Sequence, residues 1–377
     1  MKKFLAILLC VCMVVAIVAC NKTDDTKTET PTTEAPTEAP TKAPDTTPDE
    51  PTEAEYKLGM GVVVAFTEGA TQVDSTVAAV VTDADGKIVA CRIDATQNKC
   101  DLTKISFDEL KETEFQSKLE KGDGYNMATY GASMDNNGDG VVKEWYEQAK
   151  AFENWVVGKT AAEVAAMPTQ TLDNNFGTAG YVISADADLL AAGCTIQTGD
   201  FVEAVVAACK DEQGVSFKTA KTFTVGVAAT SFATDSDESK GLVAMYTDYA
   251  AAVVVDGKIV AALNDAIQPK ITVEGTEVVD QAFTATKRNL KEGYNMSTFG
   301  ASMDPNGDGK VLEWYLQSEA FSKHVVGMTG AEVAAMETAA NSIGYQMTTD
   351  TDLLAAGCTI QITAIKAVVA KSVTNAR

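Results

Sequence analysis

Histidine is nearly absent from this sequence. The 377-residue chain has one, His324. Catalytic triads, bis-histidine haem sites and histidine-rich zinc sites all need imidazole nitrogens, and no other general base for hydrolysis is evident. We therefore predict that His324 is a packing residue on a helix face and that the protein is no hydrolase.

Few cysteines remain after the first twenty residues to form disulfides or redox motifs. Of eight cysteines, three lie in the first twenty residues, and the other five are Cys91, Cys100, Cys194, Cys209 and Cys358. An odd number is not a disulfide framework, although Cys91 and Cys100 are close enough in sequence for one local bridge. The chain has no CxxC or CxxCH motif, which excludes thiol exchange and covalent c-type haem.

Positive charge is in short supply. The chain has 30 Lys and Arg against 53 Asp and Glu, a formal net charge of −23. Binding to nucleic acid or to anionic lipid requires a basic surface. The balance excludes nucleic acid as a partner and fits a cationic partner or solubility outside the cell.

The first residues read as an export signal. Lys2 and Lys3 precede an apolar run from Phe4 to Ala19, which is too short for a stable membrane span. The sequence Ile17-Val-Ala-Cys20 resembles the lipobox of bacterial lipoproteins, which implies a signal peptide of residues 1–20. It also implies a lipid anchor on Cys20 and a place on the extracellular face of the cell membrane. The alternative is an ordinary cleaved signal in which Cys20 is incidental.

A Thr-, Pro- and Glu-rich segment follows, residues 21–55. It has too little apolar surface to offset the entropy of ordering, so we expect a disordered stalk. In a polyproline-like state, at about 3.1 Å per residue, it would span on the order of 100 Å.

The most informative feature is an internal repeat. The block GYNMATYGASMDNNGDG, residues 124–140, returns as GYNMSTFGASMDPNGDG at 293–309, with fourteen of seventeen positions identical. A long echo at a fixed offset indicates a duplicated domain. We predict domains at 56–212 and 218–377, linked near 211–221.

Each predicted unit begins with strands and ends with helices, an α+β arrangement. Apolar runs flank an Asp-Gly turn at Asp83–Gly86 and again at Asp256–Gly257, which predicts two hairpins. After each echoed block, Trp145, Ala149, Phe152 and Val156 recur at helical spacing, as do Trp314, Ser318, Phe321 and Val325. We interpret both stripes as core. Thr160 and Thr329 are expected to cap short helices with Glu163 and Glu332, and final helices are expected at 200–209 and 363–370.

The end of each echoed block carries oxygen ligands at the spacing of a calcium loop. Aspartate and asparagine occupy positions 1, 3 and 5, and glycine position 6. Position 12, normally a bidentate Glu, is Tyr146 or Tyr315, and a Glu stands at position 10. The spacing resembles the shortened calcium loop of the excalibur family. The candidate ligands are Asp135, Asn137, Asp139 and Glu144, then Asp304, Asn306, Asp308 and Glu313. The alternative is an Asx-rich turn that caps the helix without metal.

A second echoed element, Gly-Cys-Thr-Ile, precedes the last helix of each unit. With the amphipathic helix after it, the element is similar to the end of the FMN-binding domain family, found in flavinylated surface lipoproteins of extracellular electron transfer. In that family the last threonine of a Ser/Thr-Gly-Ala-Thr motif carries FMN through its phosphate. The resemblance implies flavin on Thr195 and Thr359, beside Gly193, Cys194, Gly357 and Cys358. Departures are Ala192 and Ala356 for the family's Ser or Thr, and cysteine for its alanine.

The resemblance implies a lipid-anchored electron carrier with a redox partner, not a turnover enzyme. The competing class is a cell-surface binding or structural module, stiffened by calcium and lacking flavin, with Cys194 a small buried hydrophobe. A third class, the solute-binding lipoproteins, fits poorly. Proteins of that class usually have two hinged lobes, whereas this chain contains two copies of a short unit.

Overall fold

Long antiparallel strands form the middle of the protein. The computed structural model describes residues 53–135, 138–172, 180–296, 298, 304, 309–341 and 344–377. The predicted signal, Cys20, almost all of the stalk, and Asn137, Asn306 and Asp308 lie outside these residues. All of the described residues belong to one compact unit. Both predicted domains therefore lie within it.

The first sheet has the order β3-β2-β1-β6. Its strands are β1 (Ala54–Phe66), β2 (Gln72–Asp83), β3 (Ile88–Lys99) and β6 (Val215–Thr219). The predicted turn after Asp83 is confirmed, since Gly86 donates a hydrogen bond to its carbonyl oxygen. Residues 215–219 are a strand paired with β1, so the expected linker contains regular structure.

The second sheet has the order β10-β9-β7. It consists of β7 (Thr224–Phe232), β9 (Tyr246–Val255) and β10 (Lys258–Ile267). Asp256 and Gly257 join β9 to β10 with φ values of 50° and 78°. Two positive φ angles are the geometry of a tight hairpin turn, so this prediction is confirmed.

A smaller sheet, β12-β11-β8, was not predicted. Its strands are β8 (Leu242–Val243), β11 (Lys270–Glu274) and β12 (Glu277–Ala282). Helix α1 (Phe107–Lys111) contributes Phe107 and Leu110 to the same apolar cluster as Val243 and Ile271.

Helices and short hairpins follow each sheet. The first half, residues 54–219, has α2 (Lys118–Lys121), α3 (Trp145–Val156), α4 (Ala161–Ala165), β4 (Thr169–Leu172), β5 (Tyr181–Ser184), α5 (Ala187–Ala191) and α6 (Gly199–Cys209). The second half, residues 224–377, has α7 (Lys287–Leu290), α8 (Trp314–His324), α9 (Gly330–Ala334), β13 (Thr338–Ala340), β14 (Gln346–Thr348), α10 (Thr351–Ala355) and α11 (Thr363–Thr374). The helix stripes and the capping boxes at Thr160 and Thr329 are as predicted.

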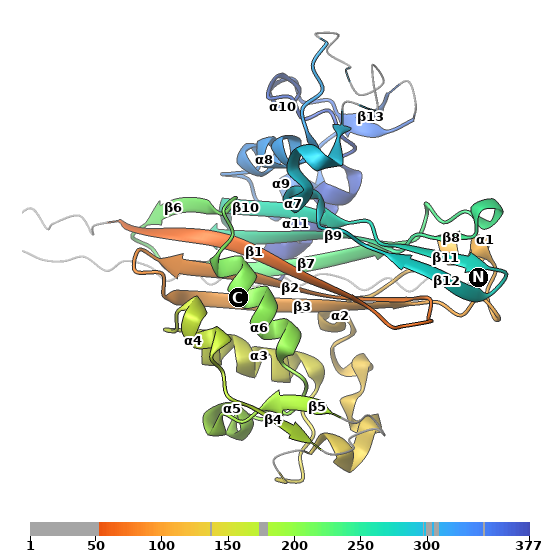
Figure 1. The fold of residues 1–377 in the computed structure, drawn as a ribbon. Helices are drawn as coiled ribbons and strands as arrows, with labels where there is room; N and C mark the ends of the chain where they lie inside the picture. Colours follow the sequence, from red (N-terminus) through yellow and green to blue (C-terminus); the bar gives the residue numbers. More distant parts are fainter. Residues whose placement is uncertain are drawn as a thin grey trace, which may run out of the picture. The chain divides into compact units, whose positions relative to one another are not determined.

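The helices cover the outer faces of two sheets that face each other (Figure 1). Strand periodicity explains the layers, because successive side chains point to opposite faces. In β2, Ala78 and Val80 pack under the helices of the first half, whereas Val77 and Ala79 pack against the second sheet. The halves therefore share a central core.

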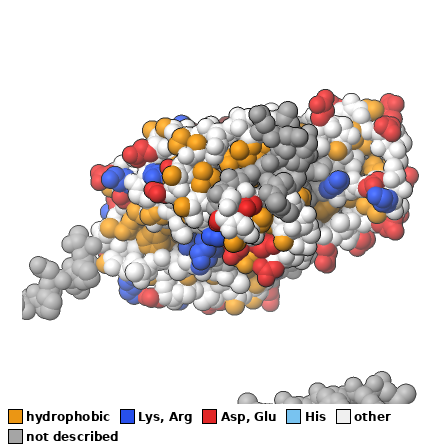
Figure 2. All heavy atoms as spheres, turned by 90° about the horizontal axis from the view of Figure 1, so that it is seen from below, with side chains coloured by type: hydrophobic (Ala, Val, Ile, Leu, Met, Phe, Trp, Pro, Cys, Tyr) orange, Lys and Arg blue, Asp and Glu red, His pale blue; other side chains and the backbone are white. Residues whose placement is uncertain are grey.

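The surface of the first half's helix layer is mixed in character. Figure 2 shows acidic side chains spread over this face, with basic and hydrophobic ones among them. Within the described part of the chain, no helix has the length and apolar character needed to cross a membrane. All five described cysteines are free thiols, so the bridge considered for Cys91 and Cys100 is not formed.

Candidate functional site

Both threonines of the Gly-Cys-Thr-Ile elements are buried. Thr195 is 2% exposed and Thr359 3%. The backbone N–H of Thr195 donates to Gln148 Oε1 at 2.8 Å, and that of Thr359 donates to Gln317 Oε1 at 2.6 Å. Each hydroxyl group lies near the same oxygen, at 3.3 Å and 3.2 Å. In this conformation neither hydroxyl faces solvent.

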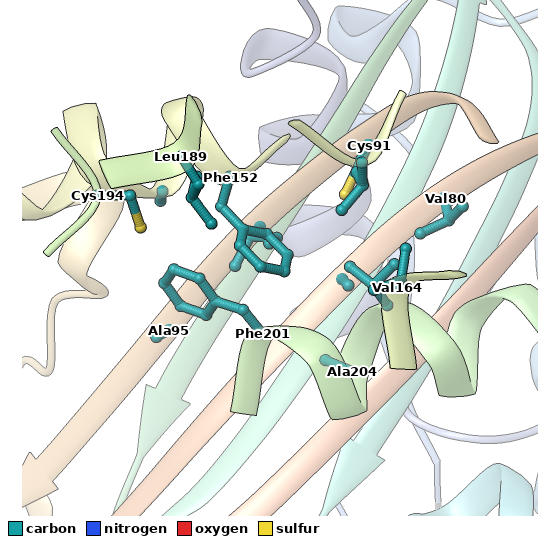
Figure 3. Close-up of a cluster of buried hydrophobic side chains, with 14 of the residues drawn as sticks. Val80, Cys91, Ala95, Phe152, Val164, Leu189, Cys194, Phe201 and Ala204 are labelled. Atoms are coloured by element: carbon teal, nitrogen blue, oxygen red, sulfur yellow. The ribbon is translucent and has the colours of Figure 1, made fainter. Parts of the chain in front are cut away.

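The neighbouring glycine and cysteine have structural roles here. Gly193 has a φ of 84° and follows the last turn of α5, where its N–H donates to the Leu190 carbonyl. This is the usual place for glycine at a helix end. The thiol of Cys194 lies among Leu189, Phe152 and Phe201 (Figure 3). Burial raises its pKa to about 12, so the thiol is protonated at neutral pH. Gly357 and Cys358 repeat this arrangement.

The predicted calcium ligands accept hydrogen bonds from the backbone. The two oxygens of Asp135 accept from the N–H groups of Asp139 and Gly140, at 3.0 Å and 2.9 Å. Glu144 Oε2 accepts from Met127 at 3.0 Å, and Glu313 Oε2 repeats this with Met296 at 3.0 Å. No three acidic, Cys or His side chains among the described residues are grouped to hold a metal ion.

The position-12 tyrosines bind carboxylates of their own half. The hydroxyl of Tyr146 donates to Asp123 at 3.0 Å, and that of Tyr315 donates to Glu292 at 2.9 Å. Each tyrosine thus ties the first turn of the long helix to the short helical turn before the echoed block.

Two pockets at matching places in the halves are the best candidate site. The first pocket has a volume of about 230 Å³ and the second about 360 Å³. The same residue type recurs at seven matching positions. They are Lys118, Tyr125, Met127, Trp145, Tyr181, Ile196 and Gln197 in the first, and Lys287, Tyr294, Met296, Trp314, Tyr345, Ile360 and Gln361 in the second.

A buried aspartate holds the lysine-bearing turn in each half. Asp94 Oδ1 on β3 accepts from Leu119 N at 3.1 Å, and Asp265 Oδ1 on β10 accepts from Arg288 N at 3.0 Å. These N–H groups belong to the first turns of α2 and α7. N–H groups in the first turn of a helix have no carbonyl acceptor within the helix, so each aspartate supplies one. Burial raises the pKa of Asp94 to about 6, against the lowering effect of hydrogen bonds.

Each pocket lysine lies over aromatic rings. Lys118 Nζ is 5.1 Å from the ring centre of Tyr125 and 5.6 Å from that of Trp145. Lys287 Nζ is 5.2 Å from Tyr294 and 5.3 Å from Trp314. An ammonium group is attracted to ring faces at such distances, so the positive charge is directed into an aromatic pocket.

A larger cavity of about 410 Å³ between β10 and α8 is a weaker candidate. Its polar groups are already paired within the protein. Arg288 contacts Asp211 at 3.2 Å, and Asn264 Nδ2 donates to Ser322 Oγ at 2.9 Å. A ligand there would have to compete with these contacts.

The pocket lysines were not predicted from the sequence, and Trp145 and Trp314 were predicted as core residues only. The sequence does contain a pattern that indicates these lysines. Ser117-Lys118 and Thr286-Lys287 lie just before the two copies of the echoed block, and they are separated by 169 residues, as the copies are. Comparison with family models, curated proteins and solved structures found no match for this chain. We therefore infer the function from the residues of this chain.

Proposed function

We propose that this protein is a two-site binding protein displayed on the outer face of the cell membrane through a lipid anchor at Cys20. Its halves are two copies of one duplicated α+β unit, and each copy binds one ligand in its lysine–aromatic pocket. The ligand is a planar anion, and FMN is the one that the sequence resemblance implies. The protein would carry electrons to or from a redox partner and would not turn over a substrate.

The recurrence of the pocket in both halves carries this proposal. A core needs apolar side chains at these places, but it does not need a lysine that faces aromatic rings in each half. Tyrosine and tryptophan faces stack on flat ring systems, while lysine attracts phosphate or an electron-rich ring oxygen. The first volume is below, and the second just above, the lower limit of ligand pockets, which is roughly 300 Å³. They suit a ring system whose phosphate chain extends outside the pocket.

Covalent attachment of FMN through Thr195 or Thr359 requires a conformational change. Because both hydroxyl groups are buried against glutamine side chains, the Gly-Cys-Thr-Ile segment must open before a transferase reaches them. Reversible binding in the pocket needs no such opening. The two modes are distinguishable by mass.

The first experiment measures the intact mass and in-gel flavin fluorescence of protein purified from its native membrane. The covalent mode predicts a mass increase of one or two FMN groups that Thr195→Ala and Thr359→Ala remove one at a time. Without that increase, the covalent mode is rejected.

Reversible binding is tested by titrating the purified protein with FMN and following flavin fluorescence. We expect Lys118→Met and Lys287→Met each to weaken one site by about tenfold or more, since a charge-assisted hydrogen bond contributes about 1.5–3 kcal/mol. Lys150→Met, on the exposed side of α3, is the matched control. A colourless protein that binds no FMN would reject the flavin proposal.

The alternative is a calcium-stiffened module without flavin. Its support is that both halves keep the acidic positions Asp135, Asp139 and Glu144, with counterparts Asp304, Asp308 and Glu313. Extracellular sites of this kind bind at about 10⁻⁴–10⁻³ M. Calcium at millimolar concentration should then raise the melting temperature, and Asp135→Asn with Asp304→Asn should remove the increase.

A further inference from the structure

The second pocket contains a buried carboxylate whose interactions are unusual. Asp248 lies on β9, lines the pocket and is only 8% exposed. Among the described residues, none donates a hydrogen bond to its carboxylate, and the charges that act on it are Lys287 and Asp265. The carboxylate lines the pocket and has no hydrogen-bond donor from the protein there, so the site favours a ligand that supplies one.

Lys287 is the opposite charge in the same pocket. Its ammonium lies over Tyr294 and Trp314, and it forms no ion pair within 4.0 Å in the described part of the chain. Asp248 and Lys287 thus face one aromatic cavity without neutralising each other through direct contact. The cavity presents a negative and a positive group to whatever enters it.

Strand register shows that this carboxylate distinguishes the second pocket from the first. Asp248 pairs with Ala266, the residue after Asp265, and Thr76 pairs with Ala95, the residue after Asp94. Thr76 therefore occupies the corresponding place in the first pocket. The carboxylate that lines the first pocket, Asp200, is exposed at the start of α6.

We propose that the second pocket binds a small zwitterion with an aromatic side chain, of the class of free aromatic α-amino acids. The ligand's ammonium group binds Asp248, its carboxylate binds Lys287, and its ring packs against Trp314 and Tyr294. This inference rests on the pocket of the proposed function, but it gives the second copy a zwitterion in place of flavin. A volume of about 360 Å³ accommodates a ligand of this size.

The titration of Asp248 supplies a signature with a definite sign. Burial raises the pKa of Asp248 to about 6, the repulsion of Asp265 adds to this, and the attraction of Lys287 opposes it. An ammonium ligand needs the ionised carboxylate, so its affinity falls as pH drops below about 6. An anionic ligand without an ammonium group is repelled by the ionised carboxylate. Its affinity therefore rises as the pH drops below about 6 and the carboxylate becomes protonated. The other titratable groups that line the pocket are Asp235, Tyr246, Tyr294 and Tyr345.

The experiment is calorimetric titration of the full chain with L-phenylalanine and with 3-phenylpropionate, which lacks the ammonium, at pH 7.5 and pH 5. At pH 7.5 we expect one site per chain for L-phenylalanine and at least tenfold weaker binding of 3-phenylpropionate. At pH 5 the affinity for L-phenylalanine should fall about tenfold, because about a tenth of a group with a pKa of 6 is ionised there. The affinity for 3-phenylpropionate should rise.

Two variants locate the site. Asp248→Asn should remove both the preference for L-phenylalanine and its pH dependence, and Lys287→Met should weaken both ligands. Asp280→Asn, an exposed aspartate on β12, is the control. If Asp248→Asn does not fold, the effect of Lys287→Met and the pH dependence of the affinity for each ligand still test the proposed zwitterion site.

Equal affinity for the two ligands, or L-phenylalanine binding unaffected by Lys287→Met, would overturn the inference. Titration of the unsubstituted chain with FMN separates the two proposals. If this chain binds L-phenylalanine but no FMN, flavin is rejected as the ligand and the zwitterion site stands.

Discussion

At the scale of single residues, one glutamine in each half organises the Gly-Cys-Thr-Ile element. Gln148 is fully buried, and its Oε1 accepts from the N–H groups of Thr195 and Ile196, while its Nε2 donates to the carbonyl oxygen of Lys143. Gln317 repeats the contacts with Thr359 and Leu312. A buried amide that satisfies several backbone groups is expensive to remove, because each group left unpaired costs about 1–3 kcal/mol.

We therefore predict that Gln148→Ala lowers the free energy of unfolding by about 2–4 kcal/mol, from unpaired N–H groups and a small cavity. Urea unfolding followed by tryptophan fluorescence measures it. Gln97→Ala, on an exposed position of β3, should change stability by less than about 0.5 kcal/mol. Equal effects from the two substitutions would show that the contacts of Gln148 contribute little.

At the scale of elements, the last helix of each half lies unusually close to its sheet. A Cβ placed on Gly61 of β1 would lie 2.1 Å from the carbonyl oxygen of Ala204 in α6. A Cβ on Gly226 of β7 would lie 1.8 Å from that of Ser372 in α11. Only glycine permits such a backbone approach, and it brings α6 and α11 down onto the strands.

The predicted consequence is that Gly226→Ala pushes α11 away from β7 and destabilises the protein by about 1–3 kcal/mol or more. The melting temperature by circular dichroism is the readout. Gly124→Ala is the matched control, because a Cβ there meets no atom within 4 Å. A Gly226→Ala protein as stable as this control would mean that the helix is not held at the observed distance.

At the scale of the whole molecule, the two halves are fastened by a common core and by buried charges. Leu58 and Val77 of the first half share a cluster with Val227 and Tyr249 of the second. Arg288 of α7 pairs with Asp211, beyond the end of α6, and their side chains are 6% and 8% exposed.

We predict that the described unit unfolds in a single calorimetric transition, because separating the halves would expose the shared core. Arg288→Ala should cost about 3–5 kcal/mol, since it leaves the buried Asp211 carboxylate without an opposite charge. Arg288→Met with Asp211→Leu should restore only part of the loss, because the N–H groups of Met60 and Gln213 then lose the carboxylate that accepts from them. Two separate transitions would show instead that the halves are independent domains.

Much of the local structure follows from sequence patterns. The Asp-Gly hairpins, the helix stripe from Trp145 to Val156 and the capping boxes at Thr160 and Thr329 depend on residues near one another in the chain. Turn chemistry, helical periodicity and caps are short-range, so they are readable without a fold. Strand β6 and the sheet of β8, β11 and β12 were missed, because a short strand needs a partner that the sequence does not name.

The residues of the chain alone determined the repeat, the acidic balance, and the main hairpins and helices of each half, and they predict the anchor and the stalk. Tertiary structure alone decided that the sheets face each other, that the threonine hydroxyl groups are buried, and that Lys287, Trp314 and Asp248 meet in one pocket. The physical reason is that these residues come from elements far apart in the chain. Whether they meet depends on how the sheets and helices pack, and that packing is fixed only when the whole core forms.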